Sequence, residues 1–244
     1  MTAGLLAAKI ALGPLLLPQA SWLRRKAVRL PEAAGPREGV VGDGNPVLRL
    51  LVVGDSSAAG VGLARQTQAL ALPLAARLHE RLGVAVVWQL VAQSGVNTQE
   101  AVALLDRAEL APADVVVTAL GVNDVSSQIS AARFTLLTAQ LWSLLKERTG
   151  ARWAVLSGLP PMGLLTAVPQ PLRWYLGRYA TWLDAAAHQW AEEQCMGFCS
   201  LRWTSDPTLL SHDGFHPGEL VYPQWADRLT DIIVSGRESW AVGR

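Results

Sequence analysis

From residue 47 onward, short apolar runs alternate with longer segments of helical periodicity. Runs of this kind, rich in Val and Leu, predict buried parallel strands at residues 47–53, 84–91, 114–120 and 152–157, with a weaker strand near 198–203. Leu and Ala recur at helical spacing in the segments 65–82, 98–110, 131–148, 171–194 and 222–236. Strands that alternate with helices predict an α/β fold, in which helices cover both faces of a parallel five-stranded sheet. Thr98 is the expected N-cap of the second helix.

The first 23 residues do not follow this pattern. They are apolar with one charge, at Lys9, and Pro14 and Pro18 interrupt the charge-free run. That run, residues 10–23, is shorter than the roughly 20 residues that a membrane-spanning helix needs. An arm packed on the domain, a segment that contacts a membrane and a cleaved signal all fit the pattern.

The basic residues after this run bear on the choice between these alternatives. A secretory signal carries its positive charge before the apolar stretch, whereas here the charges come after it. An apolar segment followed by basic residues can lie on a membrane with its basic end in the cytoplasm. The sequence therefore favours a cytoplasmic location over secretion, with a membrane-surface contact through residues 1–30 as one alternative. The basic residues are Arg24, Arg25, Lys26 and Arg29.

Residues 31–46 are rich in Gly, Pro and charged residues, a composition that is typical of a linker or surface loop. A chain of 244 residues fits one large domain. We therefore expect residues 1–46 to form an N-terminal arm and linker, and residues 47–244 to form one catalytic or binding domain.

Composition excludes several classes of protein. Hydrophobic residues make up 50% of the chain and charged residues 17%, below the roughly 25% of an average soluble domain, so the chain is not intrinsically disordered. The net charge of +1 argues against a nucleic-acid partner. Two cysteines, Cys195 and Cys199, are too few for a disulfide scaffold or a four-ligand zinc site. They are interpreted as two thiols or as one local disulfide.

The carboxyl ends of parallel strands face a common cleft, so the segments that follow the strands are the first place to look for chemistry. Gly54, Asp55 and Ser56 follow the first strand. No Lys-Ser/Thr pair and no G-x-G-x-x-G spacing accompany these residues, which excludes the common phosphate-binding motifs. Ser56, at a strand end near a helix N-terminus, is a candidate nucleophile.

A nucleophilic serine needs a base. Asp213 precedes His216 by three residues in a short loop before the last helix, so its carboxylate can hold one imidazole nitrogen while the other faces the serine. His212 flanks the same aspartate but lacks this spacing. His79 and His188 fall inside predicted helices and are interpreted as structural.

Stabilisation of an oxyanion needs hydrogen-bond donors. Gly95, after the second strand, can offer an unobstructed backbone N–H, and Asn123, after the third, can offer its side-chain amide. A turn glycine and a helix cap are the alternative interpretations. The apolar segment 159–169 after the fourth strand can line an acyl pocket, act as a lid, or pack on its own domain.

Taken together, these segments resemble the SGNH hydrolase (GDSL esterase/lipase) family over residues 47–235. The resemblance implies a three-layer α/β/α, flavodoxin-like fold with Ser56 as nucleophile, His216 as base and Asp213 orienting it. It implies an oxyanion hole from the Ser56 and Gly95 N–H groups and the Asn123 side chain, and it requires no metal or cofactor. Ser57 departs from the family pattern, where Leu is common, and we expect this change to alter packing and substrate shape. The matching segments are Gly54-Asp55-Ser56, Gly95, Gly121-Val122-Asn123-Asp124 and Asp213-Gly214-Phe215-His216.

The expected function is that of a serine carboxylic-ester hydrolase that cleaves small-molecule esters of apolar acyl groups through an acyl-enzyme on Ser56. A carbohydrate O-acetyl esterase, a lysophospholipase or a thioesterase on the same fold is the alternative within the enzyme class. A binding domain without catalytic activity is the alternative outside it.

Overall fold

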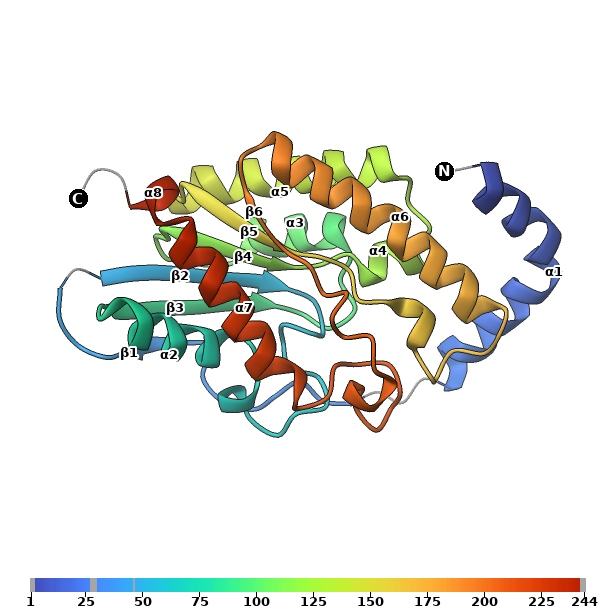
Figure 1. The fold of residues 1–244 in the computed structure, drawn as a ribbon, viewed down its shortest axis with the longest axis horizontal. Helices are drawn as coiled ribbons and strands as arrows, with labels where there is room; N and C mark the ends of the chain where they lie inside the picture. The colour runs from blue at the N-terminus through green and yellow to red at the C-terminus, as the bar shows by residue number, and fades with distance from the viewer. Residues whose placement is uncertain (1–2, 27–29, 46, 242–244) are drawn as a thin grey trace.

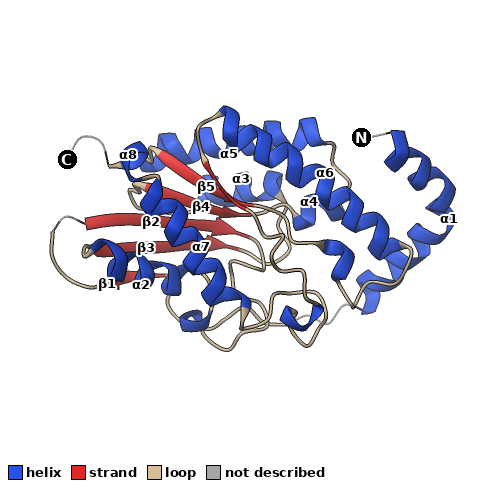
Figure 2. Cartoon of the chain, in the orientation of Figure 1, coloured by secondary structure: helices blue, strands red, loops and turns tan. Residues whose placement is uncertain are grey.

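The computed structural model describes residues 3–26, 30–45 and 47–241. Its centre is a six-stranded sheet in the order β1-β3-β2-β4-β5-β6, with helices on both faces (Figures 1 and 2). The strands are β1 (Glu38–Val41), β2 (Val47–Gly54), β3 (Ala85–Ala92), β4 (Val115–Ala119), β5 (Trp153–Ser157) and β6 (Gly197–Cys199).

Five of the strands, β2 to β6, are parallel. Counted among themselves along the chain, they stand in the order 2-1-3-4-5, which is the order of the flavodoxin-like fold. The three-layer α/β/α prediction is therefore confirmed. β1 adds an antiparallel edge strand beside β3, which the hydrophobic pattern does not predict.

The two faces of the sheet bury alternate side chains of each strand, as the two-residue period of a strand requires. Leu50 and Val52 of β2 pack toward α2 and α7, whereas Leu51 and Val53 pack toward α3 and α5. The helices are α1 (Ala3–Lys26), α2 (Ala71–Leu82), α3 (Thr98–Arg107), α4 (Val122–Ser126), α5 (Ala131–Thr149), α6 (Leu172–Glu193), α7 (Val221–Ser235) and α8 (Arg237–Trp240). Short 3₁₀ turns are η1 (Gln66–Gln68), η2 (Met162–Leu164) and η3 (Pro207–Leu209).

The predicted helix at residues 65–82 is wrong in its first part. A run of turns follows Ser56, and α2 begins only at Ala71. Gly60 and Gly62 have positive φ angles of 73° and 88°, which a right-handed helix does not accommodate. Ser56 therefore does not lie at the N-terminus of a long helix.

Two smaller expectations also need correction. Asn97, not Thr98, caps α3: its side chain accepts a hydrogen bond from the Glu100 N–H, and the Glu100 side chain accepts one from the Asn97 N–H. This capping box frees the hydroxyl of Thr98 for another partner. The last predicted strand is also shorter than expected, because β6 ends at Cys199.

The segment expected to be a linker or surface loop is attached to the folded domain, although Ala33 is the one buried residue among residues 31–45. Residues 38–41 pair with β3, and the backbone of Ala33 and Ala34 binds the turns that follow Ser56. The buried Gln66 side chain donates to the carbonyl oxygens of both Ala33 and Ala59, each at 3.0 Å. The Gly- and Pro-rich composition reflects tight turns around the sheet edge rather than mobility. The domain boundary at residues 46 and 47 stays a prediction.

The N-terminal apolar run is a continuous helix, so the expectation that Pro14 and Pro18 interrupt it is wrong. α1 has 24 residues and is long and apolar enough to cross a membrane, a test that some soluble and signal helices also pass. It lies beside α6 at the end of the molecule toward which β2 to β5 point (Figure 1). Leu5 and Leu16 are buried there.

Candidate active site

The loops that leave β2 and β4 meet at the point where the order of the parallel strands reverses. In open α/β sheets this point is the usual place for a ligand. Ser56 follows β2 directly, and the backbone there is held close to β4: the Asp55 N–H donates to the Ala119 carbonyl at 3.1 Å. A Cβ atom at Gly54 would lie 2.4 Å from the Ala58 side chain and 2.8 Å from the Ala119 carbonyl oxygen. Glycine at residue 54 therefore permits the close approach that presents Ser56.

Ser56, His216 and Asp213 form one hydrogen-bonded chain. The Nε2 atom of His216 lies 3.1 Å from Ser56 Oγ, and its Nδ1 atom lies 2.6 Å from Asp213 Oδ2. The His216 side chain is 16% exposed and that of Asp213 is 5% exposed. The structure thus brings together the three residues that the sequence predicts as nucleophile, base and orienting acid.

The Asp213 carboxylate is also fixed by its own loop. Its Oδ1 atom accepts hydrogen bonds from the N–H groups of Phe215 at 2.9 Å and His216 at 3.0 Å. Burial raises the pKa of Asp213, but the hydrogen bonds from His216 and from these N–H groups outweigh burial and hold the pKa below its ordinary value. Asp213 therefore stays ionised and can support positive charge on His216.

The sequence reasoning missed the role of Asp55. This residue is 2% exposed, and its Oδ1 atom accepts hydrogen bonds from the Ser57 N–H and hydroxyl at 2.9 and 2.8 Å. Burial raises its pKa, while the bonds from Ser57 oppose the rise. The hydroxyl of Ser57, the position that departs from the family pattern, thus serves as a partner for a buried carboxylate. The buried Tyr222 hydroxyl donates to the Ser57 carbonyl at 3.0 Å and joins α7 to this turn.

Asn123 lies beside the segment that carries Gly95. Its Nδ2 atom donates to the Val96 carbonyl at 2.9 Å and makes a longer contact of 3.4 Å with Asp55 Oδ2. Gly95 has a φ angle of 84°, as a turn glycine does. Among the described residues, neither Gly95 nor Asn123 lines the cavity that opens beside Ser56 and His216, and their role as oxyanion donors stays a prediction.

Asp124, next to Asn123, has a structural partner that the sequence did not indicate. It is fully buried, and its carboxylate accepts hydrogen bonds from the N–H and the hydroxyl of Thr98. Burial raises the pKa of Asp124 to about 6; the bonds from Thr98 oppose this shift and the nearby Asp55 adds to it. This contact ties α4, and with it Asn123, to the start of α3.

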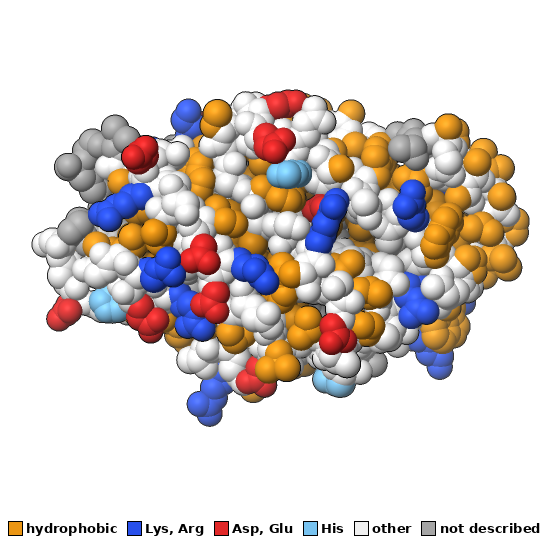
Figure 3. Space-filling view, in the orientation of Figure 1, with side chains coloured by type: hydrophobic (Ala, Val, Ile, Leu, Met, Phe, Trp, Pro, Cys, Tyr) orange, Lys and Arg blue, Asp and Glu red, His pale blue; other side chains and the backbone are white. Residues whose placement is uncertain are grey.

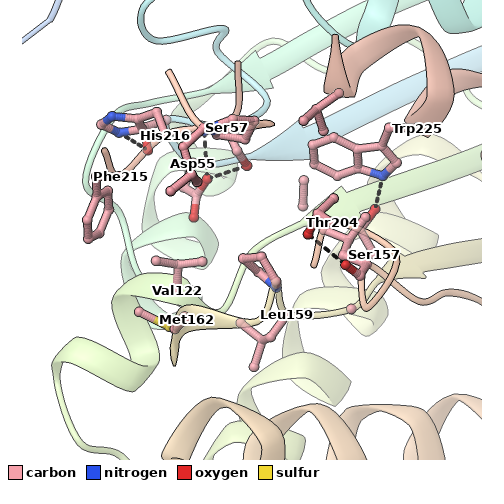
Figure 4. A pocket seen from close by; sticks show the side chains of 18 of the residues that line it. Asp55, Ser57, Val122, Ser157, Leu159, Met162, Thr204, Phe215, His216 and Trp225 are labelled. Carbon is pink, nitrogen blue, oxygen red and sulfur yellow. Dashed lines mark hydrogen bonds between the residues drawn. The ribbon is translucent and has the colours of Figure 1, made fainter. Parts of the chain in front are cut away.

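A cavity opens beside Ser56 and His216. His216 lies at one side of it and Trp225 at the other, where the Trp225 Nε1–H donates to Ser157 Oγ at 3.2 Å (Figure 4). Because Ser157 accepts the hydrogen bond of the indole N–H, the Trp225 ring presents an apolar surface to the cavity on this side. The leucine, valine, methionine and aromatic side chains of the lining are those of Leu120, Val122, Leu159, Met162, Leu165, Leu201, Leu209, Leu210, Phe215, Val221 and Trp225.

The apolar segment after β5 both lines the cavity and packs on its own domain, while its part in binding an acyl group stays a prediction. Leu159, Met162 and Leu165 line the cavity and also belong to a buried cluster with α6. The Ala167 N–H donates to the Gly214 carbonyl at 3.1 Å, which links this segment to the loop of His216. Gly214 has a φ angle of 66°, and a Cβ atom there would lie 2.3 Å from Thr166 Oγ1.

The remaining histidines and the cysteines lie outside this arrangement. His212 is exposed, and its Nδ1 atom lies 3.4 Å from Ser211 Oγ. The ring of His79 contacts the Val84 carbonyl, and His188 stacks on Phe198. Cys195 is exposed and Cys199 is buried, both as free thiols. Within the described ranges, no three His, Cys, Asp or Glu side chains gather as metal ligands would.

Comparison with known proteins places these features in context. A sequence model of the GDSL-like lipase/acylhydrolase family matches residues 52–222. That range contains Ser56, Gly95, Asn123, Asp213 and His216. A comparison with curated proteins finds no match.

Solved structures of similar fold include an esterase, a lipase and the protein TesA. The psychrotrophic esterase EstA from Pseudoalteromonas sp., solved with monoethylphosphonate, is 20% identical with a TM-score of 0.57, over 78% of this chain and 98% of its own. TesA is 23% identical with a TM-score of 0.58, over 76% and 97% of the two chains. The extracellular lipase of Streptomyces rimosus is 17% identical with a TM-score of 0.56, over 76% and 99%. At these identities the likeness concerns the fold.

Proposed function

The chain belongs to the GDSL-like lipase/acylhydrolase family, and on this basis we propose that it is a carboxylic-ester hydrolase that cleaves esters of apolar acyl groups. The observation that carries the proposal is the 3.1 Å contact between His216 Nε2 and Ser56 Oγ at the side of an apolar cavity. A hydroxyl beside a neutral imidazole that is itself held by a carboxylate is an activated nucleophile.

The proposed reaction has two acyl transfers. His216 takes the proton of Ser56 while Oγ attacks the ester carbonyl carbon, and the tetrahedral intermediate then collapses as His216 returns that proton to the leaving alcohol. Water attacks the acyl-enzyme in the same way and releases the carboxylic acid and Ser56. Asp213 stabilises the imidazolium that forms in both steps.

The oxyanion would rest on the N–H groups of Ser56 and Gly95 and on the amide of Asn123. The contact of Asn123 that an oxyanion can replace is the 3.4 Å one with Asp55, since the 2.9 Å bond to Val96 is the stronger of the two. The stronger bond then keeps the amide oriented during the reaction, as a preorganised donor requires.

The lining of the cavity supports an apolar acyl group as the part of the substrate that it binds. Leucine, methionine and aromatic side chains form most of the wall away from Ser56. A carbohydrate O-acetyl esterase would need polar groups to bind its sugar, so this alternative fits the cavity less well. A lysophospholipase or thioesterase fits it equally, because these differ in the leaving group. A domain without catalytic activity would have no need for the aligned His216 and Asp213. A cytoplasmic location stays a prediction.

The test combines active-site labelling with a chain-length series. A fluorophosphonate should label wild-type protein at Ser56 and leave Ser56→Ala unlabelled. p-Nitrophenyl esters of increasing acyl length should give a maximum in kcat/KM above acetate. Leu120→Trp adds bulk to the cavity wall and should move that maximum to shorter chains. Leu144→Trp, at a half-buried leucine of α5 outside the cavity, is the matched control. Absence of both labelling and hydrolysis in folded protein would contradict the proposal.

A further inference from the structure

α1 leaves a large apolar surface uncovered. In the described part of this helix the buried residues are Leu5 and Leu16. Figure 3 shows hydrophobic side chains gathered over α1 at one end of the molecule. Contiguous apolar surface of this kind marks an interaction site on a protein in water. The large exposed apolar side chains of α1, between 47% and 72% accessible, are Leu6, Ile10, Leu15, Leu17 and Trp22.

The length and charge of α1 match a lipid partner. A helix of 24 residues extends about 36 Å at 1.5 Å per residue, and only Lys9 is charged before residue 24. An ordinary surface helix has a polar face toward water, whereas α1 exposes large apolar side chains on the faces that do not pack against the domain. Hydrocarbon can cover such a surface without any matching shape, which a protein partner would have to provide.

The charges at the end of the helix favour one kind of lipid surface. Arg24, Arg25 and Lys26 are exposed in the last turn, directly after Trp22 and Leu23. Trp is enriched at the boundary between hydrocarbon and water, and basic residues beside it attract anionic headgroups. If instead the α1 helices of two copies of this chain paired in parallel, their basic last turns would lie side by side and repel each other.

We propose that α1 binds a lipid bilayer that contains anionic headgroups, with its exposed apolar side chains in the hydrocarbon and its basic last turn among the headgroups. The helix remains joined to the domain through Gln19, whose side chain donates to the Gln170 carbonyl at 2.6 Å and accepts from the Leu172 N–H at 3.0 Å. The carboxyl ends of β2 to β5 point toward the same end of the molecule (Figure 1). A bilayer on α1 would therefore lie on the side of the domain that carries the candidate active site.

Flotation of the full chain with vesicles tests this proposal. Wild-type protein should float with phosphatidylcholine vesicles that contain phosphatidylglycerol. The double variant Ile10→Asp/Leu17→Asp changes the two most exposed aliphatic side chains of α1, each 72% accessible. It should weaken binding more than about 100-fold. Arg24→Gln/Arg25→Gln/Lys26→Gln should weaken binding to the anionic vesicles by roughly 100-fold or more. Leu220→Asp, at a side chain 68% accessible outside α1, is the matched control and should float as wild type does.

The outcomes separate this proposal from the proposed function. Equal flotation of wild type and the Ile10/Leu17 variant, or no flotation of wild type, would overturn the role of α1. A wild-type dimer that dissociates in that variant and never floats would assign the surface to a second copy and also overturn it. Hydrolysis of p-nitrophenyl acetate, a soluble ester, should be the same in all these forms. Loss of that activity in every form would contradict the esterase proposal while leaving the flotation result intact.

Discussion

The Nε2 atom of His216 lies 3.1 Å from the Oγ atom of Ser56, although the two residues are 160 positions apart in the chain. The contact exists because β2 and the loop before α7 end at the same edge of the sheet, and because Tyr222 of α7 binds the Ser57 carbonyl. Asp213, three residues before His216, contacts the other side of the imidazole through a 2.6 Å hydrogen bond between its Oδ2 atom and Nδ1.

Replacement of Ser56 by alanine should abolish ester hydrolysis. The change removes the hydroxyl oxygen that forms the acyl-enzyme, so kcat should fall by about 10³-fold or more. Stopped and steady-state assays with a p-nitrophenyl ester measure the rate, and circular dichroism checks that the variant is folded. Near-native activity in folded Ser56→Ala would remove Ser56 from the mechanism.

The two histidines beside Asp213 should differ sharply. His216→Ala should reduce kcat as much as Ser56→Ala, because the base and the nucleophile act as one unit. His212→Ala is the matched control: its ring is exposed, and its contact of 3.4 Å is with Ser211. The measurement is kcat for both variants at one pH. A larger loss in the His212 variant would reassign the base.

Asn123→Ala should lower kcat by about 10²–10³-fold with little change in KM. An oxyanion donor acts mainly in the transition state, so its loss affects the chemical step rather than ground-state binding. The variant also loses the 2.9 Å bond to Val96, and thermal unfolding reports that structural part separately. A raised KM at constant kcat would make Asn123 a substrate-binding residue instead.

Asp124 should make the protein more stable as pH falls from about 6 toward 4. Its pKa is about 6 in the folded chain against 3.8 ordinarily, so in this window the folded state binds more protons than the unfolded state. The free energy of unfolding therefore decreases as pH rises through the window. Asp124→Asn has no carboxylate to titrate, so its free energy of unfolding should not fall in this way. The difference in that free energy between the variant and wild type should therefore shift in favour of the variant by up to about 3 kcal/mol from pH 4 to pH 7.

Urea unfolding of both proteins at intervals of one pH unit measures this difference. Asp106→Asn, which removes an exposed carboxylate of α3, controls for the loss of one charge. Parallel curves for wild type and Asp124→Asn would show that burial does not perturb this carboxylate.

Two N-terminal deletions should differ in their melting temperatures. A chain that begins at Leu30 loses α1 but keeps the bonds of Ala33 and Ala34 to the turns after Ser56, so it should hydrolyse soluble esters normally. A chain that begins at Gly42 also loses β1 and those bonds. Several lost hydrogen bonds should cost more than about 3 kcal/mol, or roughly 6–12 °C in Tm. Equal Tm values for the two deletions would contradict the role assigned to residues 30–41.

The sequence by itself was sufficient for the parallel part of the fold and for the residues of the candidate site. The runs of Val and Leu in β4 and in the second half of β2 are buried on both faces, so their hydrophobicity is continuous and easy to recognise. Ser56 and His216 could be identified because strand ends converge in this architecture. Asp213 was identified by its spacing from His216, a local feature.

Tertiary structure decided the features whose cause lies in another part of the chain. β1 has four residues and half of them are exposed, so only its pairing with β3 makes it a strand. The hydroxyl of Thr98 binds Asp124 rather than capping α3, because packing brings α4 to the start of that helix. Gln66 and Ser57 satisfy buried oxygens that no local pattern marks. Burial of a polar group creates a requirement for a partner, and that partner is set by the packing of distant segments rather than by neighbouring residues.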